Sequence, residues 1–283
     1  MTFDEIIRGA CGARRHFFPA GIDAPLFTAD WHGALFAHFT IDPQRLQPSI
    51  PFELDTWQGR GYVSLVAFTQ SNLRPSVGGP LASWLIAPIA RHAFLNLRTY
   101  VRVGGVRGIY FIAEWIPNRL AVLLGPRTYG LPYRLGRLRY ENDPTRRRLR
   151  GRVCGSGSDG GAFAYEADYP ASFAAARGRS LDEFLLERYV AFTRRGGVSR
   201  RFLVDHAPWQ QQRVDLRRFD CGIMQLAGDW APHARFIAAH FSPGVSGVTI
   251  GAPRALDGLP KPLSHAVEPP DGLGREGQRR LEV

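Results

Sequence analysis

Lysine is almost absent from this sequence: Lys261 is the only lysine among 36 basic residues, and all the others are arginines. The formal net charge of +11 and the pI near 10.3 would suit a surface that binds polyanions. The arginines, however, are spread along the chain, and the local clusters at 146–152 and 200–201 have no interleaved aromatic residues to stack on bases. We therefore expect solvated strand faces and no nucleic-acid partner.

Cysteine and long apolar runs are scarce as well. Cys11, Cys154 and Cys221 lie far apart without a C-x-x-C pair, which argues against a disulfide framework and against a zinc site. The first residues lack the apolar core of a signal peptide, and no run of about 18 uncharged apolar residues occurs. We expect a cytoplasmic protein with no bound metal and no membrane partner.

Several catalytic motifs are also missing. The sequence has no G-x-x-x-x-G-K-[ST], no H-E-x-x-H, no G-x-S-x-G, and no G-x-G-x-x-G between a strand and a helix. It therefore gives no support for a P-loop nucleotide site, a zinc peptidase, a serine hydrolase or a dinucleotide-binding domain. We expect no cofactor.

Glycine, proline and alternating apolar residues are abundant. The 31 glycines and 21 prolines are typical of a loop-rich β protein, and alternation predicts strands at 31–40, 94–103, 107–116, 119–124, 137–142, 147–154 and 161–169. Short turns such as Gly104–Gly105 join them, which favours an antiparallel meander. The fold class predicted is mainly β, a β-rich α+β protein.

Helices are predicted at fewer positions. Ser180 and Glu183 form a capping box before apolar residues at helical spacing that extend to Phe192, and 231–240 suggests a second helix. Residues 1–20 read as a lead-in segment and 21–256 as one domain. The composition of 257–283, rich in proline, glycine and charge, predicts a disordered tail.

Residues 125–136 (GPRTYGLPYRLG) combine glycines and prolines with Arg127, Tyr133 and Arg134. The pattern predicts an irregular loop that places charged and phenolic groups at a sheet edge, where sites often lie. An ordinary turn would have the same composition, so both interpretations stay open.

A buried arginine is predicted on the strand 94–103, where Asn96 and Arg98 share one face. A bare buried charge costs several kcal/mol, and Glu114 is the nearest acid in the neighbouring strand. Arg98 either forms a structural ion pair with Glu114 or faces a pocket and receives a substrate carboxylate.

The loop and four other segments carry a resemblance to a known family. Gly125, Pro132, Leu135 and Gly136 match a G-R-E-x-x-x-[YF]-P-K-K-L-G motif of acetoacetate decarboxylase. The segments WHGALFAHF (31–39), NLRTYV (96–101), GIYF (108–111), ERY (187–189) and HAPW (206–209) resemble the YqjF-like bacterial proteins of the same superfamily. The resemblance spans about residues 25–255 and implies a β-barrel or cone with a few flanking helices.

The resemblance also implies what this chain lacks. Tyr133 and Arg134 stand where the family has its two lysines, and Phe94 stands where the superfamily has a glutamate. Tyrosine cannot form an imine and arginine stays charged, so Schiff-base decarboxylation is not expected. Lys261, in the expected tail, is no credible substitute.

Three functions remain. The first is binding of a small organic acid or carbonyl compound in the barrel cavity, near Arg98, Glu114, Arg127, Tyr133 and Arg134. The second is a different enzyme on the same fold, with Tyr133 or His206 as acid or base, His206 being chosen because it precedes the rigid Pro-Trp of HAPW. The third is a non-catalytic interaction protein.

Overall fold

The computed structural model describes residues 24–156 and 161–256. The expected lead-in segment 1–20 and the expected tail 257–283 with Lys261 lie outside these residues. The strands are β1 (Pro25–Ile41), β2 (Glu53–Leu54), β3 (Gly61–Pro75), β4 (His92–Val103), β5 (Val106–Ile116), β6 (Tyr133–Asp143), β7 (Arg148–Gly155), β8 (Ala162–Asp168), β9 (Val190–Arg195), β10 (Val198–Asp205), β11 (Gln212–Val214), β12 (Leu216–Asp220), β13 (Arg235–Gly251) and β14 (Arg254–Ala255). The helices are α2 (Pro43–Leu46), α3 (Gly79–Ile86), α4 (Arg119–Thr128) and α5 (Leu181–Leu186), with 3-10 turns η1 (Gln47–Ser49), η2 (Ala87–Ile89), η3 (Gly222–Ala227) and η4 (Ala231–His233).

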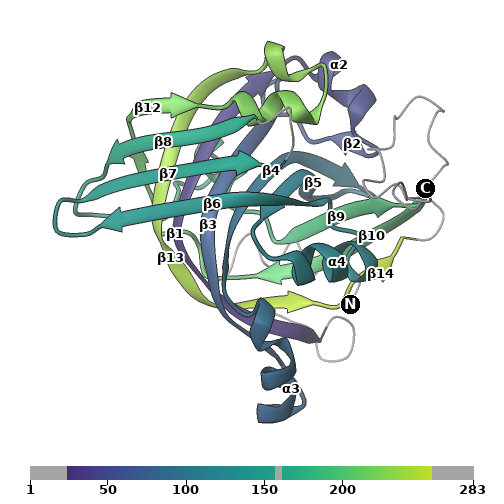
Figure 1. The fold of residues 1–283 in the computed structure, drawn as a ribbon. Helices are drawn as coiled ribbons and strands as arrows, with labels where there is room; N and C mark the ends of the chain where they lie inside the picture. Colours follow the sequence, from purple (N-terminus) through teal and green to yellow (C-terminus); the bar gives the residue numbers. More distant parts are fainter. Residues whose placement is uncertain (1–23, 157–160, 257–283) are drawn as a thin grey trace, which may run out of the picture.

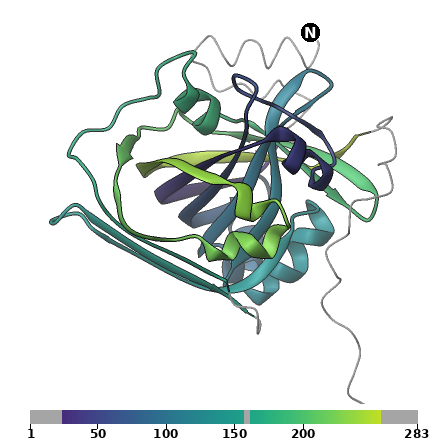
Figure 2. The same cartoon turned by 90° about the horizontal axis from the view of Figure 1, so that it is seen from above.

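The strands form one 14-stranded sheet that closes on itself. Pairing runs from β5 through β9, β10, β13, β1, β3 and β4 back to β5, and β6, β7, β8 and β12 extend from β5 as an arm. Figures 1 and 2 show the long strands β1, β3 and β13 with the arm lying across one side of them. The mainly β fold class is confirmed. Most pairs are antiparallel, whereas β5 pairs in parallel with β6 and β9.

Strand β5 changes its neighbour halfway along. Its first half pairs with β9 at Ile109 and Tyr110, and its last residues pair with β6, where Glu114 lies opposite Tyr133. Gly108 makes the β9 contact possible, because a Cβ there would lie 2.5 Å from the Val190 carbonyl oxygen. The change of partner brings the end of β5 beside the segment that the sequence marks as a site.

The two faces of β3, β4 and β5 pack against different parts of the chain. One face contributes Leu95, Leu97 and Val101 to the main apolar cluster, together with residues of the arm and η3. The opposite face carries Asn96, Arg98 and Tyr100, as the alternation predicts, and is covered by α5, the segment 205–209 and the start of β6. We call this second side the polar face.

Three predictions of secondary structure are wrong. The segment 125–136, predicted as an irregular loop, comprises the end of α4, a connection at 129–132 and the start of β6. Residues 119–124, predicted as a strand, belong to α4, whose N-cap Asn118 accepts a hydrogen bond from the Ala121 amide. Residues 231–240, predicted as a helix, comprise the short turn η4 and the first part of β13. Helix α5 is also shorter than its spacing suggests: it ends at Leu186, and Phe192 lies in β9.

Candidate polar site on the covered face of the sheet

Arg98 lies on β4 in the centre of the polar face and is 8% exposed. One guanidinium NH2 group donates to the Leu185 carbonyl oxygen at 3.1 Å, and the guanidinium lies 5.7 Å from the Phe36 ring centroid. The last carbonyls of a helix such as α5 lack partners within the helix, so this contact satisfies one of them. The Nε of Arg98 has no partner, and no ion pair joins Arg98 to a carboxylate among residues 24–156 and 161–256.

Glu114 is not the partner of Arg98. The strand register puts Asn96 opposite Glu114, while an irregularity after Leu97 puts Phe111 opposite Arg98. Glu114 is 2% exposed with its Oε2 unpaired, and burial raises its pKa well above the ordinary value. Burial therefore favours the protonated, neutral form of Glu114, which can donate a hydrogen bond. The Oδ1 of the neighbouring Asn96 is also buried and unpaired.

Tyr133 begins β6 beside Glu114, and its ring packs on Gly125 of α4. A Cβ at Gly125 would lie 2.2 Å from a ring carbon of Tyr133, so only glycine fits there. Helix α4 ends at Thr128, and Gly130, with φ of +71°, turns the chain into β6. Burial, and then the nearby Glu114, raise the pKa of the Tyr133 phenol well above its ordinary value, so Tyr133 remains a neutral hydroxyl group.

Arg127 and Arg134 do not join this group. Arg127 is exposed on α4 and donates to the Leu123 carbonyl oxygen of its own helix. Arg134 follows Tyr133 on β6, so its side chain takes the opposite direction. It donates to the Leu226 carbonyl oxygen at 3.0 Å and lies over the Trp115 ring. Of the arginines predicted for the site, only Arg98 lies on the polar face.

His206 lies among aromatic side chains at the margin of the polar face. Its ring is 4.9 Å from that of Tyr189 and 5.1 Å from that of Trp209, and its Nδ1 donates to the Ala207 carbonyl oxygen at 2.9 Å. Burial lowers its pKa to about 4, so the imidazole is neutral at pH 7. No hydrogen bond joins His206 to Tyr133 among the described residues.

The ERY and HAPW segments contact each other through Glu187. Its Oε1 accepts the Trp209 amide at 3.0 Å, and its Oε2 accepts the Tyr189 hydroxyl at 2.6 Å. Burial raises the pKa of Glu187, although these two hydrogen bonds act in the opposite direction. The acid thus holds the segment 206–209 against the end of α5, over the polar face.

A buried chain of polar groups next to Arg98 was not predicted from the sequence. His38 Nδ1 is hydrogen-bonded to Ser64 Oγ at 2.7 Å, and Ser64 Oγ to the Tyr100 hydroxyl at 2.6 Å. The Tyr100 hydroxyl donates to the same Leu185 carbonyl oxygen that Arg98 contacts. Burial lowers the pKa of His38 well below its ordinary value. The alternation of β1, β3 and β4 could have put these side chains on one face, but their pairing depends on strand order.

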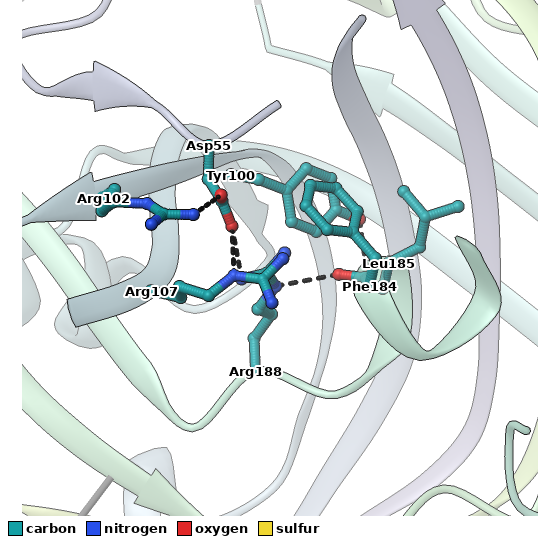
Figure 3. A network of polar contacts seen from close by, with 7 residues as sticks. All are labelled: Asp55, Tyr100, Arg102, Arg107, Phe184, Leu185 and Arg188. Carbon is teal, nitrogen blue, oxygen red and sulfur yellow. Dashed lines mark hydrogen bonds and ion pairs between the residues drawn. The ribbon is translucent and has the colours of Figure 1, made fainter. Parts of the chain in front are cut away.

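Asp55 is the second group that sequence reasoning missed. Its carboxylate accepts from Arg102, Arg107 and Arg188 at 2.7 to 2.9 Å, and Figure 3 shows the three guanidinium groups around it. Arg188, from the ERY segment, also donates to the Phe184 carbonyl oxygen and stacks on the Phe184 ring. The network joins β4, β5 and the end of α5, so Arg188 anchors the end of this helix to the sheet.

Other possible sites lie apart from the polar face. Two surface hollows of about 460 and 600 Å³ are lined by none of the predicted site residues. Within the described ranges, no group of three or more His, Cys, Asp or Glu side chains is arranged to hold a metal ion. Nor is any helix there long and apolar enough to cross a bilayer.

Comparisons with known proteins agree on the family and the fold. The model of DUF2071, described as an uncharacterized conserved protein, matches residues 28–246. The uncharacterized protein YqjF of Bacillus subtilis (strain 168) is 36% identical over 193 residues, which cover 65% of this chain and 74% of YqjF.

Solved structures extend the comparison. Acetoacetate decarboxylase from Legionella pneumophila subsp. pneumophila str. Philadelphia 1 has a TM-score of 0.56 at 10% identity, covering 89% of this chain and 94% of its own. The enduracididine biosynthesis enzyme MppR complexed with pyruvate has a TM-score of 0.56 at 12% identity, covering 83% and 92%. At these identities the likeness concerns the fold alone.

Proposed function

We propose that this chain, which belongs to the DUF2071 family, binds a small organic acid that carries a carbonyl group, on the polar face around Arg98. The observation that carries the proposal is Arg98 itself, an arginine 8% exposed that has no carboxylate partner among the described residues. Guanidinium groups bind carboxylates through strong, charge-assisted hydrogen bonds. Arg98 acts on the pKa of Glu187, but the two Glu187 oxygens accept from Trp209 and Tyr189, so a ligand carboxylate would supply the direct ion pair that Arg98 lacks.

The neutral groups beside Arg98 suit the carbonyl end of such a ligand. Burial favours the protonated form of Glu114, which can donate to a carbonyl oxygen, and the Asn96 amide next to it can do the same. Alternate residues on a strand lie about 7 Å apart, a spacing that side chains of this length can close around a three- or four-carbon acid. Unpaired buried polar atoms each cost about 1–3 kcal/mol, and the ligand would relieve part of that cost.

The proposed binding is non-covalent, with a small molecule rather than a nucleic acid as partner. Tyr133 and Arg134 occupy the positions of the two lysines in the related motif, and neither offers an amine for an imine. MppR complexed with pyruvate supports the ligand class, since its ligand is a small keto acid held on a similar fold. An acid–base enzyme built on Tyr133 and His206 has less support, because no described hydrogen bond connects them.

A thermal-shift experiment tests the proposal with pyruvate, acetoacetate, acetone and propionate. A ligand present at 100 times its Kd stabilises the folded protein by about 2.7 kcal/mol. We expect the keto acids to raise Tm more than acetone or propionate, which each carry only one of the two groups. Arg98→Met should abolish the shift.

Arg134→Met is the matched control, because Arg134 lies on the opposite side of the sheet and should leave the shift unchanged. If Arg98→Met does not fold, Arg98→Lys keeps the charge but loses the two-pronged geometry and should weaken the shift. Equal shifts in the Arg98 and Arg134 variants would refute the assignment of Arg98.

A further inference from the structure

Helix α3 exposes a group of large apolar side chains. Leu81, Trp84 and Leu85 on the helix and Val77 just before it are 64–76% exposed. The spacing from Leu81 to Trp84 and Leu85 puts these three on one face of the helix. Figure 1 shows α3 projecting from the end of the molecule beyond the strands. We call these four residues the α3 knob, and such clustered exposure marks interaction sites.

A polar hollow of about 600 Å³ is lined in part by residues that flank the α3 segment in the sequence. It is lined by His32, Thr69, Ser71, Asn72, Ala90 and Arg91. Ser71 and Asn72 precede α3, and Ala90 and Arg91 follow the turn η2 after it, so the hollow borders both ends of the α3 segment. The Leu73 amide donates to the Ala90 carbonyl oxygen at 3.2 Å and holds the two sides together.

Two arginines lie at the hollow: Arg91 lines it, and Arg74 donates to the carbonyl oxygen of the lining residue Asn72. Asp30 is the acid that contacts the hollow, and its two oxygens accept from Asn72 and the Gly247 amide. Arg91 is exposed and has no ion pair among the described residues. The hollow therefore offers the Arg91 guanidinium and the Thr69 hydroxyl to an anion, whereas the Asn72 amide donates to Asp30 and the Ser71 hydroxyl is hydrogen-bonded to His32.

We propose that the α3 knob and the hollow dock this protein on the surface of a bilayer containing anionic phospholipid. The apolar side chains would enter the boundary between headgroups and acyl chains, where tryptophan is favoured. A lipid phosphate would lie in the hollow near Arg91, Thr69 and Ser71. Basic side chains near an anionic surface contribute about 1 kcal/mol each. This differs from the expectation of no membrane partner, which rested on the lack of a long apolar run and on the spread of the arginines along the chain.

A second copy of the chain is a poorer occupant of the same surface. In a two-fold symmetric contact the same patch meets itself, so Arg91, which forms no ion pair among the described residues, would approach its own copy. Like charges brought together oppose such a contact. A projecting helix also offers no groove for a peptide, whereas a bilayer accepts a convex apolar surface.

Vesicle flotation tests the inference with the full-length protein. Wild-type protein should float with vesicles of phosphatidylcholine mixed with phosphatidylglycerol and stay behind with phosphatidylcholine alone. The variant Leu81→Ser/Trp84→Ser/Leu85→Ser should bind at least about tenfold more weakly, and Arg91→Glu about tenfold more weakly. A matched control, Leu120→Ser/Leu123→Ser/Leu124→Ser, removes exposed leucines of α4 and should float as the wild type does.

Three results would overturn the inference, provided that circular dichroism shows each variant folded. The first is no flotation of the wild type with either vesicle. The second is flotation of the α3 variant equal to that of the wild type. The third is a dimer in light scattering that the α3 variant converts to a monomer without any vesicle binding, which would assign the knob to self-association.

Discussion

Replacing Asp55 with asparagine removes the one carboxylate that three arginines share. Its side chain is 1% exposed, and that of Arg188 is 3% exposed, so this pair is fully buried. Breaking a buried pair by removing one member costs about 3–5 kcal/mol, because the other charge stays behind. Arg102 and Arg107 are 46% and 43% exposed, so their bridges add little. Since asparagine keeps one acceptor oxygen, we expect Asp55→Asn to lower the free energy of unfolding by about 3 kcal/mol, the lower end of that range.

The loss should depend on pH in a defined direction. Burial tends to raise the pKa of Asp55, but Arg188, Arg102 and Arg107 together hold it below the ordinary value. The stability that ionised Asp55 contributes is therefore fully present above the unfolded-state pKa of about 3.9 and is lost as pH falls through the lower folded-state pKa. Between pH 5 and 8 the difference between wild type and Asp55→Asn should stay constant.

Urea unfolding at pH 7 and calorimetry provide the assay. A loss of about 3 kcal/mol corresponds to a Tm lower by about 6–12 °C for a protein of this size. The control is Glu141→Gln, whose partner Arg139 is 82% exposed, and it should change stability by less than about 1 kcal/mol.

The refuting result is a Tm for Asp55→Asn within about 2 °C of the control. A double variant sharpens the test. Asp55→Leu/Arg188→Met removes both buried charges and should be less destabilised than Asp55→Leu alone. A double variant that loses the sum of the two single losses would show that the two side chains act independently.

Two further variants test the environment of the site. Glu114→Gln should gain stability relative to wild type as pH rises from 5 to 8, by at most about 1.4 kcal/mol per pH unit. The reason is that Glu114 keeps its proton in the folded protein, where burial raises its pKa, and loses it in the unfolded chain. Identical pH profiles in urea unfolding would show that Glu114 is ionised in the folded protein. Gly108→Ala should lose about 2 kcal/mol through its clash with the Val190 carbonyl oxygen and the Phe192 ring, whereas Gly178→Ala, with no atom within 4 Å of the added Cβ, should be nearly neutral in thermal unfolding.

The strands were predictable where alternation and turn chemistry agree. The turn between β4 and β5 is formed by Gly104 and Gly105, with φ of +57° and +81°, which few other residues adopt. Ser180 accepts from the Glu183 amide as the capping box requires. Local rules of this kind involve residues close in sequence, so they can be read directly from the chain.

Helix α4 was not predictable by the same rules. Leu120, Leu123 and Leu124 form an apolar run that strands also contain, and they are partly exposed on α4. The helix is favoured by the Asn118 cap and by the packing of Gly125 on the Tyr133 ring. The second of these is a tertiary contact, and tertiary contacts override local propensity.

At the site too, local features could be predicted from the sequence and tertiary contacts could not. The face shared by Asn96 and Arg98 follows from strand alternation, and the structure bears it out. The residue opposite Arg98 could not be predicted from alternation, because the irregularity in the pairing after Leu97 determines which β5 residue lies opposite Arg98. Asp55 meets Arg188 across 133 positions of sequence, a contact that depends on the closure of the whole ring.

A crystal structure of the protein grown with a small keto acid would test the proposed function most directly. The proposal predicts the ligand carboxylate at about 2.7–2.9 Å from guanidinium nitrogens of Arg98, with its carbonyl oxygen near Glu114 and Asn96. An acid bound instead beside Arg134, or an Arg98 contacting only the Leu185 carbonyl oxygen at saturating ligand, would contradict it.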